Sequence, residues 1–492
     1  MLAVRKYDQS CSMKLSKSSV ERVASAFATL DLGDPRRKQR VLRTVENLAA
    51  EPSASFPNAM GSDADLEGAY RLMSSSHVGM AELNEAHAQA TAERARAARR
   101  VLAIHDTTTF DFKNADPEEI GYLNTGKAGF MAHYALIVSR DDERRPLGIS
   151  YVETITRRKP PSKPSRTGRR DRNRCGAETA RDPDRESLRW GRGLTSTETL
   201  LDGVDVIHVG DRETDSFELL ASALEQGARF VFRARVLTRR VVSEDDEPET
   251  LRDIINGASG TLSRDVQLGS RKGISAPRSA HPNRTARMAA LTFSTARVEI
   301  KRPRYRTDLP DSLQVNVVRV FEPNPPPNEE PIEWVLLTTE SVATDADVAA
   351  IVDMYRARWL IEECNKALKT GCSYESRQFE SLDALQTLLA LTLPIACELL
   401  WLRAACRRNP NSPARNVLTP TQLKVLSVMG SRKLGPNPTA HDALWAVAGL
   451  GGHIKSNGEP GWQVLYRGMA KLLAYEEGWL AREKHEELSI SR

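Results

Sequence analysis

Apolar residues change their spacing along this chain, and each change predicts a different kind of element. From residue 20 to about 95 they recur every three or four positions, as in SSVERVASAFATL, which is typical of amphipathic helices. A second segment of this kind, PRRKQRVLRTVENLAA, begins with a proline that suits the first turn of a helix. The pattern predicts a small helical domain at the N-terminus.

After residue 100 the pattern becomes typical of strands. Three apolar, β-branched runs, VLAIHDTTTF, HYALIVS and PLGISYVETI, predict a three-stranded meander. The next segment, TETLLDGVDVIHVGDRETD, predicts a strand that ends at an aspartate. A helix in SFELLASALEQG, closed by Gly227, and another strand in RFVFRARV follow, and this order predicts α/β structure. Residues 261–340 return to short strands, LTFSTARVEI, LQVNVVRVF and EWVLLTT, and helices are expected from about residue 345 to the end.

Composition excludes several classes of protein. The 492 residues allow two to four domains, and 40% hydrophobic with 27% charged residues is typical of a globular chain rather than a disordered or collagenous one. The most apolar segment, residues 385–402, is interrupted by Gln386, Pro394 and Glu398, so it predicts a buried, proline-kinked helix rather than a membrane span. The N-terminus lacks the apolar stretch of a secretory signal, and six cysteines without a CxxC pair indicate a reducing compartment, so we expect a cytoplasmic protein.

The positive charge of the chain is small in total but concentrated in short segments. The net charge is only +5, but residues 157–192 contain 13 Arg and Lys against five Asp and Glu, with Pro160, Pro161 and Pro164 and three glycines among them. This stretch predicts a loop or arm that contacts nucleic acid, or else a solvated insertion. In the second N-terminal helix, Arg36, Arg37 and Arg40 form either a phosphate-tracking face or an ordinary solvated surface.

Two aspartates follow apolar strand patterns. Asp106 lies between VLAIH and three threonines, and Asp211 follows VIHVG. Two strands that bring acids to one sheet can hold Mg²⁺, which prefers carboxylate oxygens together with water and substrate phosphate. Alternatively, each aspartate forms a turn or caps a helix.

A third acid lies in YRARWLIEECNKALKTG, which reads as one helix. Its stripe combines one acid with an aromatic residue and three cations at helical spacing: Tyr355, Arg358, Glu362, Lys366 and Lys369. Glu363 is turned about 100° away from this stripe. An ordinary salt bridge between Arg358 and Glu362 on a solvated face is the alternative.

These three segments together resemble a known family. The DTTTF around Asp106, the GDRETD around Asp211 and the Y-x-x-R-W-x-x-E-x-x-x-x-x-x-K run that ends at Lys369 look like the acidic motifs of bacterial cut-and-paste DDE transposases. Within that group they are similar to the insertion-sequence-four family. LGDPRRKQR, EGAYR, RFVFR, EWVLLTTE, VLTPTQLKVL and LGGHIKSNGEPGW are similar to family segments in the same order, so the resemblance covers nearly the whole chain.

The resemblance implies an α/β fold with three parts. Residues 91–400 would form an RNase H-like catalytic core, a mixed sheet flanked by helices, with a β-rich insertion at about 238–345. Residues 1–90 would form a helical DNA-binding domain, and residues 401–492 a helical dimerisation domain. Asp106 would lie on the first strand, Asp211 on the fourth and Glu362 on a later helix.

The resemblance also implies a chemistry and its partners. Asp106, Asp211 and Glu362 would bind two Mg²⁺ ions, with Mn²⁺ able to substitute, for the hydrolysis and transesterification of phosphodiesters. The enzyme would bind the terminal inverted repeats, nick them, form hairpins and join the 3′ ends to target DNA as a homodimer. It would need no membrane, and without a GxxxxGK[ST] loop we expect no nucleotide cofactor.

The remaining candidates would contact DNA. By resemblance, Trp334 would stack on a base flipped from the hairpin end, and the alternative is a core tryptophan. Tyr355, Arg358 and Lys369 would grip phosphates, with Lys366 beside them. Arg233 would contact the backbone unless it is only an exposed strand end. The N-terminal residues Arg36, Arg37 and Arg40 would read the terminal repeats.

Two other functions remain open from the residues alone. The chain could be a DNA-binding protein derived from such an enzyme that occupies the ends without cutting, or a metal-dependent nuclease or phosphohydrolase with other substrates. The presence of all three acids, and of Tyr355, Arg358 and Lys369, favours the transposase over a non-catalytic derivative.

Overall fold

The computed structural model describes residues 17–158, 182–243, 249–270, 273, 282–327, 329–408, 410–454 and 460–490. Five helices come first: α1 (Lys17–Ser25), α2 (Pro35–Ala50), α3 (Phe56–Ala59), α4 (Asp63–Met73) and α5 (Met80–Ala98). Asp34 caps α2 by accepting a hydrogen bond from the backbone N–H of Arg36, and Pro35 occupies the first turn. The buried face of α2 packs against α1, α4 and the long helix α13 (Leu382–Arg408). These helices confirm the helical pattern predicted for the N-terminal region.

A single nine-stranded sheet forms the centre of the molecule, in the order β3-β2-β1-β4-β5-β9-β8-β7-β6. Its strands are β1 (Arg100–Asp111), β2 (Gly129–Ser139), β3 (Pro146–Ile155), β4 (Asp205–Gly210), β5 (Arg229–Arg233), β6 (Gly260–Leu268), β7 (Arg287–Lys301), β8 (Ser312–Phe321) and β9 (Glu333–Thr338). The first three strands form the predicted antiparallel meander, and β4 and β5 continue it in parallel. The fold class is therefore α/β with a mixed sheet, as expected.

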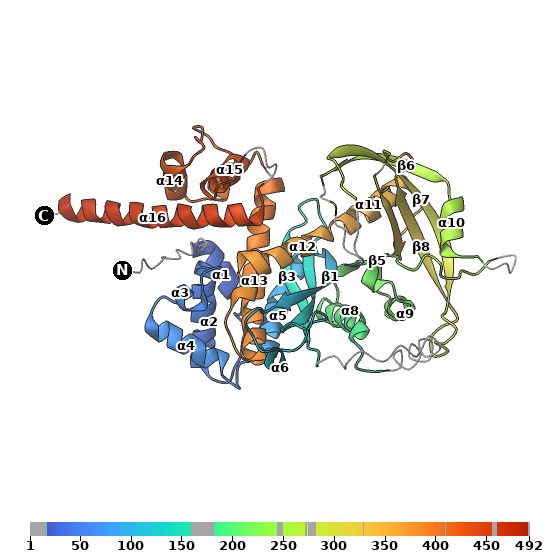
Figure 1. Cartoon of the computed structure of the whole chain (residues 1–492), viewed down its shortest axis with the longest axis horizontal. Coiled ribbons are helices and arrows are strands. Elements are labelled where there is room, and N and C mark those ends of the chain that lie inside the picture. Colours follow the sequence, from blue (N-terminus) through green and yellow to red (C-terminus); the bar gives the residue numbers. More distant parts are fainter. Residues whose placement is uncertain are drawn as a thin grey trace, which may run out of the picture.

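The β-rich insertion does not form a separate sheet. Strand β9 pairs antiparallel with β5, where Phe232 lies opposite Leu337, so β6–β9 extend the same sheet. Figure 1 shows β6, β7 and β8 at one end of the molecule and the N-terminal helices at the other. The strand pattern predicted the β content of this region, but it carried no signal for which strand the insertion would join.

The remaining helices pack around the sheet or form the C-terminal region. They are α6 (Pro117–Ile120), α8 (Arg189–Leu200), α9 (Phe217–Glu225), α10 (Leu251–Gly257), α11 (Asp345–Arg356), α12 (Trp359–Lys366), α14 (Pro420–Met429), α15 (Ala440–Leu450) and α16 (Trp462–Ile490). In Figure 1, α13 lies between the N-terminal helices and the sheet, while α16 runs away from the sheet toward the C-terminus. Among the described residues, one stretch, Leu382–Trp401 of α13, is apolar and long enough to cross a membrane, but 83% of it is buried inside the protein. It is the predicted core helix, with Pro394 inside it.

The end of the basic stretch differs from the expected loop or arm. Residues 189–192 belong to α8, because Trp190, Leu194 and Thr197 fall on one helical face and are buried. Residues 159–181, which carry most of the arginines, lie outside the described residues. Four of the five described arginines of the stretch are bound to acids: Arg157 to Glu186, Arg185 to Glu218, Arg189 to Glu213 and Arg192 to Glu153.

Candidate active site

Two neighbouring parallel strands bring the two aspartates to the same edge of the sheet. Asp106 lies within β1, and Asp211 directly follows β4. Ile104 is paired with Val209 across these strands, so the same register continued by two residues places Asp106 beside Asp211 on one face. One oxygen of Asp211 accepts a hydrogen bond of 2.8 Å from the N–H of Glu213 and caps a short 3₁₀ turn, Arg212–Thr214. Asp211 therefore performs the structural task that the sequence left open as its alternative.

The third acid reaches the same place from a helix. Glu362 lies on α12, and Asn365, one turn further along that helix, donates a hydrogen bond of 3.0 Å to Oδ2 of Asp106. Arg358 donates to Oε1 of Glu362 over 3.3 Å, which is the predicted i,i+4 pair. The pair is not on a solvated face, because the side chain of Arg358 is only 17% exposed.

The electrostatics show that the other two acids act on Asp106. Burial, and after it the neighbouring Glu362 and Asp211 carboxylates, raise the pKa of Asp106 to about 7, while Arg358 opposes the rise. Burial lowers the pKa of Arg358, but Tyr355 and the three acids outweigh it, so its pKa lies above the ordinary value. A cation is therefore favoured at this position, and Arg358 supplies only part of the compensating charge.

The donor set suits a hard divalent cation, since all three side chains offer carboxylate oxygens. Burial first, and the neighbouring carboxylates second, raise the pKa of Asp106, and a bound cation would oppose both effects. Among the described residues, however, no group of three His, Cys, Asp or Glu side chains is drawn tightly enough together to enclose an ion. The residues fit a divalent cation chemically, and both hydrogen bonds from Arg358 go to Oε1 of Glu362.

The predicted stripe of one continuous helix is wrong in part. The chain turns at Ala357 and Arg358, between the end of α11 and the start of α12, so Tyr355 belongs to a different helix from Glu362. Lys366 binds Glu363 at 3.1 Å and covers the ring of Trp359, away from the acids. The lysine is drawn there because Glu363 is buried and lies one turn away.

Lys369 is also displaced from simple helical spacing. It lies in a π-helical segment, Ala367–Gly371, that continues α12. Its Nζ donates a hydrogen bond of 2.5 Å to the carbonyl oxygen of Thr109 on β1 and covers the ring of Phe110. Lys369 is therefore held beside the strand that carries Asp106.

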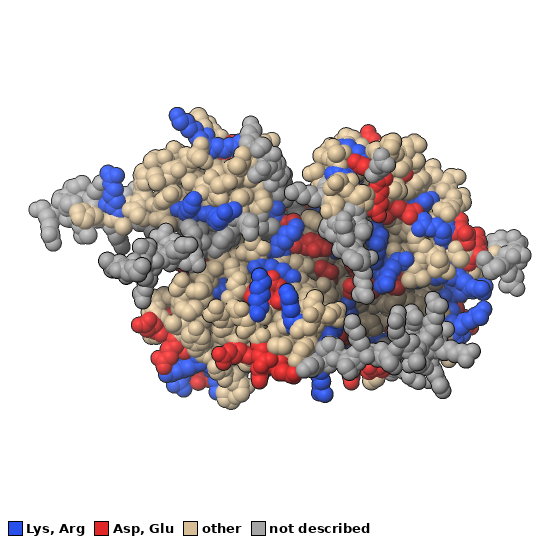
Figure 2. All heavy atoms as spheres, in the orientation of Figure 1, with Lys and Arg blue, Asp and Glu red and all other residues tan. Residues whose placement is uncertain are grey.

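A groove of about 680 Å³ lies beside the acids, at the junction between the core and the insertion strands. Its lining includes Arg358 and the predicted DNA contacts Arg233, Trp334 and Tyr355. The rings of Trp334 and Tyr355 meet edge to face at 5.4 Å, and Arg233 lies 6.0 Å above the indole. Trp334 is only half-buried, so it is not a pure core residue. Figure 2 shows acidic side chains recessed near the centre of one face, with Lys and Arg on either side.

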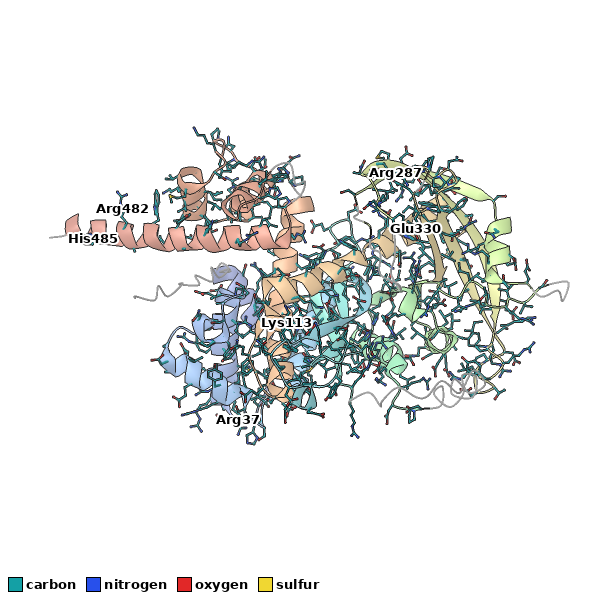
Figure 3. All side chains as sticks on the ribbon, viewed as in Figure 1. Arg37, Lys113, Arg287, Glu330, Arg482 and His485 are labelled. Carbon is teal, nitrogen blue, oxygen red and sulfur yellow. The ribbon has the colours of Figure 1, made fainter. Side chains whose placement is uncertain are left out.

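The N-terminal arginines lie far from this groove along the chain and at a distant end of the molecule. Figure 3 labels Arg37 on the N-terminal helices and Lys113, which follows β1, near the middle of the view. Arg36 pairs with Asp34, and Nη1 of Arg37 donates to the carbonyl oxygen of Leu32 at 2.9 Å. Arg40 is exposed on the same helix. The structure therefore does not bring these three arginines to the acids.

Sequence reasoning missed two residues that contact Asp106 through a short chain of hydrogen bonds. Asn365 bonds Asp106 directly, and the hydroxyl of Tyr134 on β2 donates to Oδ1 of Asn365 over 2.5 Å. The signal for Asn365 was present, because it lies three positions after Glu362 and hence on the same helical face. Tyr134 had no such signal, since its place opposite Asp106 depends on the strand register.

Comparison with known families agrees with this geometry. Residues 21–78, which span the N-terminal helices α1 to α4, match the family described as Transposase DNA-binding. Residues 194–396 match the family described as Transposase DDE domain, and they include Asp211 and Glu362, while Asp106 precedes the match. The DDE domain is an RNase H-like fold that implies dependence on a divalent metal. The chain is therefore a DDE-type transposase, an enzyme that binds DNA and acts on it.

Proposed function

We propose that this transposase moves an insertion sequence by a cut-and-paste route of the insertion-sequence-four type, most similar to that of the transposase of transposon five. It binds the terminal inverted repeats, nicks each end, releases the element through a hairpin and joins its 3′ ends to target DNA. The observation that carries the proposal is the convergence of Asp106, Asp211 and Glu362, which is close enough for Glu362 and Asp211 to raise the pKa of Asp106.

The three acids are proposed to hold two Mg²⁺ ions, for which Mn²⁺ can substitute. When bound, such ions activate the attacking oxygen and stabilise the leaving 3′ oxygen of a phosphodiester. Asp106 and Asp211 are presented by adjacent strands, so the sheet holds them in place. Glu362 is presented by α12 instead, where Arg358 donates to Oε1 of its carboxylate.

The cations of the chain around the acids are proposed to hold the DNA. Arg358, which lies beside Glu362 and lines the groove, would bind a phosphate near the scissile bond with its guanidinium N–H groups. Tyr355 lines the groove next to it, and Lys369 stands beside β1. We assign Lys366 a role at the rim only, because it binds Glu363.

The groove at the junction is proposed to receive a flipped base. Trp334 offers a half-buried aromatic face, and stacking on such a face is worth about 1 to 3 kcal/mol per base. Arg233 is half-buried above that ring, where it can contact the backbone that carries the flipped nucleotide.

The two ends of the chain are proposed to bring the DNA ends together. Residues 1–90, with Arg36, Arg37 and Arg40, would recognise the terminal repeats. Residues 401–492 would join two copies into a homodimer, because α14 and its neighbours expose apolar side chains: Val428, Met429, Ile454, Tyr475 and Leu480. Residues 91–400 between them would cut and join the DNA, and the protein would act in the cytoplasm on the bacterial nucleoid.

The proposal is tested with purified protein and labelled DNA that carries the element's own ends, in Mg²⁺ or in EDTA, on denaturing gels. We expect 3′ nicks and then hairpins in Mg²⁺, and neither in EDTA. Glu362→Ala should abolish both products and keep end binding. Glu225→Ala, an exposed acid at the end of α9, is the matched control and should cut normally.

Other results would contradict the proposal. End binding without strand scission under any divalent metal would leave a DNA-binding protein without this catalysis. Nicks that never become hairpins would exclude the hairpin route while keeping the nuclease step. Equal loss of binding and cutting in Glu362→Ala would indicate that Glu362 supports the fold rather than the reaction.

A further inference from the structure

Two buried polar side chains connect the first catalytic acid to the helix of the third. Nδ2 of Asn365 donates to Oδ2 of Asp106 over 3.0 Å, and the hydroxyl of Tyr134 donates to Oδ1 of Asn365 over 2.5 Å. Tyr134 is fully buried and Asn365 is only 8% exposed. Neither side chain caps a helix or takes part in the hydrogen bonds between strands. Their two hydrogen bonds instead form a chain that ends at the carboxylate of Asp106.

The fold places the three side chains together by two independent means. Tyr134 on β2 lies directly opposite Asp106 on β1 in the antiparallel register, so both side chains leave the same face of the sheet. Asn365 lies one turn after Glu362 on α12, so this helix brings the third acid and the amide to the site together. A shift of α12 would therefore change Glu362 and the support of Asp106 at once.

Tyr134 determines which way round the amide of Asn365 sits. A phenol hydroxyl carries its proton at neutral pH, so the hydroxyl of Tyr134 acts as a donor here. Oδ1 of Asn365 accepts this hydrogen bond, and the NH₂ group must then face Asp106. The reversed amide would oppose its oxygen to the carboxylate, which is repulsive when Asp106 is ionised.

We propose that Asn365, oriented by Tyr134, is a positioning residue that holds the carboxylate of Asp106 ready to ligate the catalytic cation. The inference rests on the proposed function and deepens it. The N–H donor of Asn365 occupies one lone pair of Oδ2 and restricts rotation of the carboxylate, together with the backbone hydrogen bond that Thr107 gives to Asp106. Partners of this kind fix metal ligands, and their loss typically weakens metal affinity by about 10- to 100-fold.

The test compares Asn365→Leu, which keeps the shape but removes both hydrogen bonds, with Tyr134→Phe, which removes only the hydroxyl. Tyr151→Phe is the matched control, because it removes a hydroxyl that binds Glu153 on the neighbouring strand β3. For each full-length variant, Mn²⁺ affinity is measured by electron paramagnetic resonance of the free ion. The Mg²⁺ concentration for half-maximal nicking, the affinity for end DNA and the melting temperature are measured alongside.

We expect Asn365→Leu to bind Mn²⁺ about 10- to 100-fold more weakly and to need correspondingly more Mg²⁺ for nicking, with end binding unchanged. Tyr134→Phe should lose about fivefold, the value of one hydrogen bond, and Tyr151→Phe nothing. Wild-type Mn²⁺ affinity in both variants would overturn the inference while the proposed function stood. A parallel loss of melting temperature and end binding would also overturn it, since the residues would then only support the fold. Wild-type protein that neither binds Mn²⁺ nor nicks DNA would instead overturn the proposed function itself.

Discussion

The two halves of the sheet are built differently although they are hydrogen-bonded to each other. The catalytic half consists of β1 to β5 and the insertion half of β6 to β9. In the catalytic half, all but one of the 11 residues of β2 are buried, because α5 and α8 pack on one face and α12 and α13 on the other. In the insertion half, β8 and β9 also supply buried residues to clusters on both faces, but none of the nine residues of the edge strand β6 is buried. The comparison teaches that the acids sit where the sheet is covered on both faces, whereas the proposed base pocket lies at the junction of the halves.

The largest expected contrast concerns acids in the two halves. Asp106→Asn should reduce strand nicking by about 1,000-fold or more, because a neutral amide cannot replace a carboxylate ligand of a divalent cation. Asp265→Asn, an exposed acid on β6, should leave nicking unchanged. Rates are measured with labelled end DNA, and end binding serves as the control for folding. A comparable defect in both variants would erase the distinction between the halves.

Core substitutions should sharpen the same contrast in stability. Leu136→Ala on β2 removes a fully buried side chain that packs in the cluster with α13, and should lower the free energy of unfolding by about 3 kcal/mol. Leu262→Ala on the half-buried β6 should cost about 1 kcal/mol or less. Urea unfolding followed by circular dichroism provides the measurement. Equal losses would mean that the insertion strands carry as much of the core as the catalytic strands.

The junction itself should respond to Trp334. Trp334→Ala should reduce hairpin formation by the loss of about 1 to 2 kcal/mol of stacking, or roughly 5- to 30-fold, with little change in the first nick. Trp334→Phe keeps an aromatic face and should recover most of the hairpin product. The ratio of hairpin to nicked strand on denaturing gels distinguishes the variants. A defect confined to the first nick would place the tryptophan in another role.

The smallest expected effect is a pH dependence of the free energy of unfolding, caused by His133 on β2 in the catalytic half. Burial, with Arg189 and Arg192 nearby, lowers the pKa of His133 to about 3, so the unfolded chain binds a proton below pH 6.5 that the folded chain refuses. This contribution to stability is present above pH 6.5 and is lost as pH falls toward 3. At pH 5.5 the loss is about 1.4 kcal/mol. His133→Gln should flatten the decline of unfolding free energy between pH 7 and pH 5.5 by that amount, and an unchanged slope would contradict the assignment.

Much of the fold could be predicted because its signals are local. The meander β1–β3, the strand before Asp211 and the buried helix α13 each show their own period or apolar run. Helix α8 was missed because it begins inside a stretch dominated by charge, where Trp190 and Leu194 are sparse markers. The joining of β9 to β5 is a long-range pairing, and the spacing of residues along the chain does not encode it.

The same distinction between local signals and long-range contacts applies to the candidate site. Asp106 and Asp211 could be placed because each comes directly after an apolar strand pattern in the sequence, and Glu362 because the motif around it resembles a family. The turn at Ala357 separates Tyr355 from Glu362, and the π-helical segment displaces Lys369 from simple helical spacing. Lys366 keeps its spacing from Glu362 on α12, but its ammonium group binds Glu363 instead. Tyr134 needed the strand register, which only the folded sheet provides.

The pairing of β5 with β9 has a consequence for how this protein can vary. The chain leaves the catalytic half at Arg233 and returns through Leu336, which lies directly opposite it in the ladder. Neighbouring strands are about 4.8 Å apart, so the two ends of the excursion already meet, whatever its length. Segments between β6 and β8 can therefore lengthen, shorten or accept a foreign domain at their outer turns without moving the strands that carry the acids. The pairing of β5 with β9 thus fixes the base of the insertion, while its outer turns are free to vary in length.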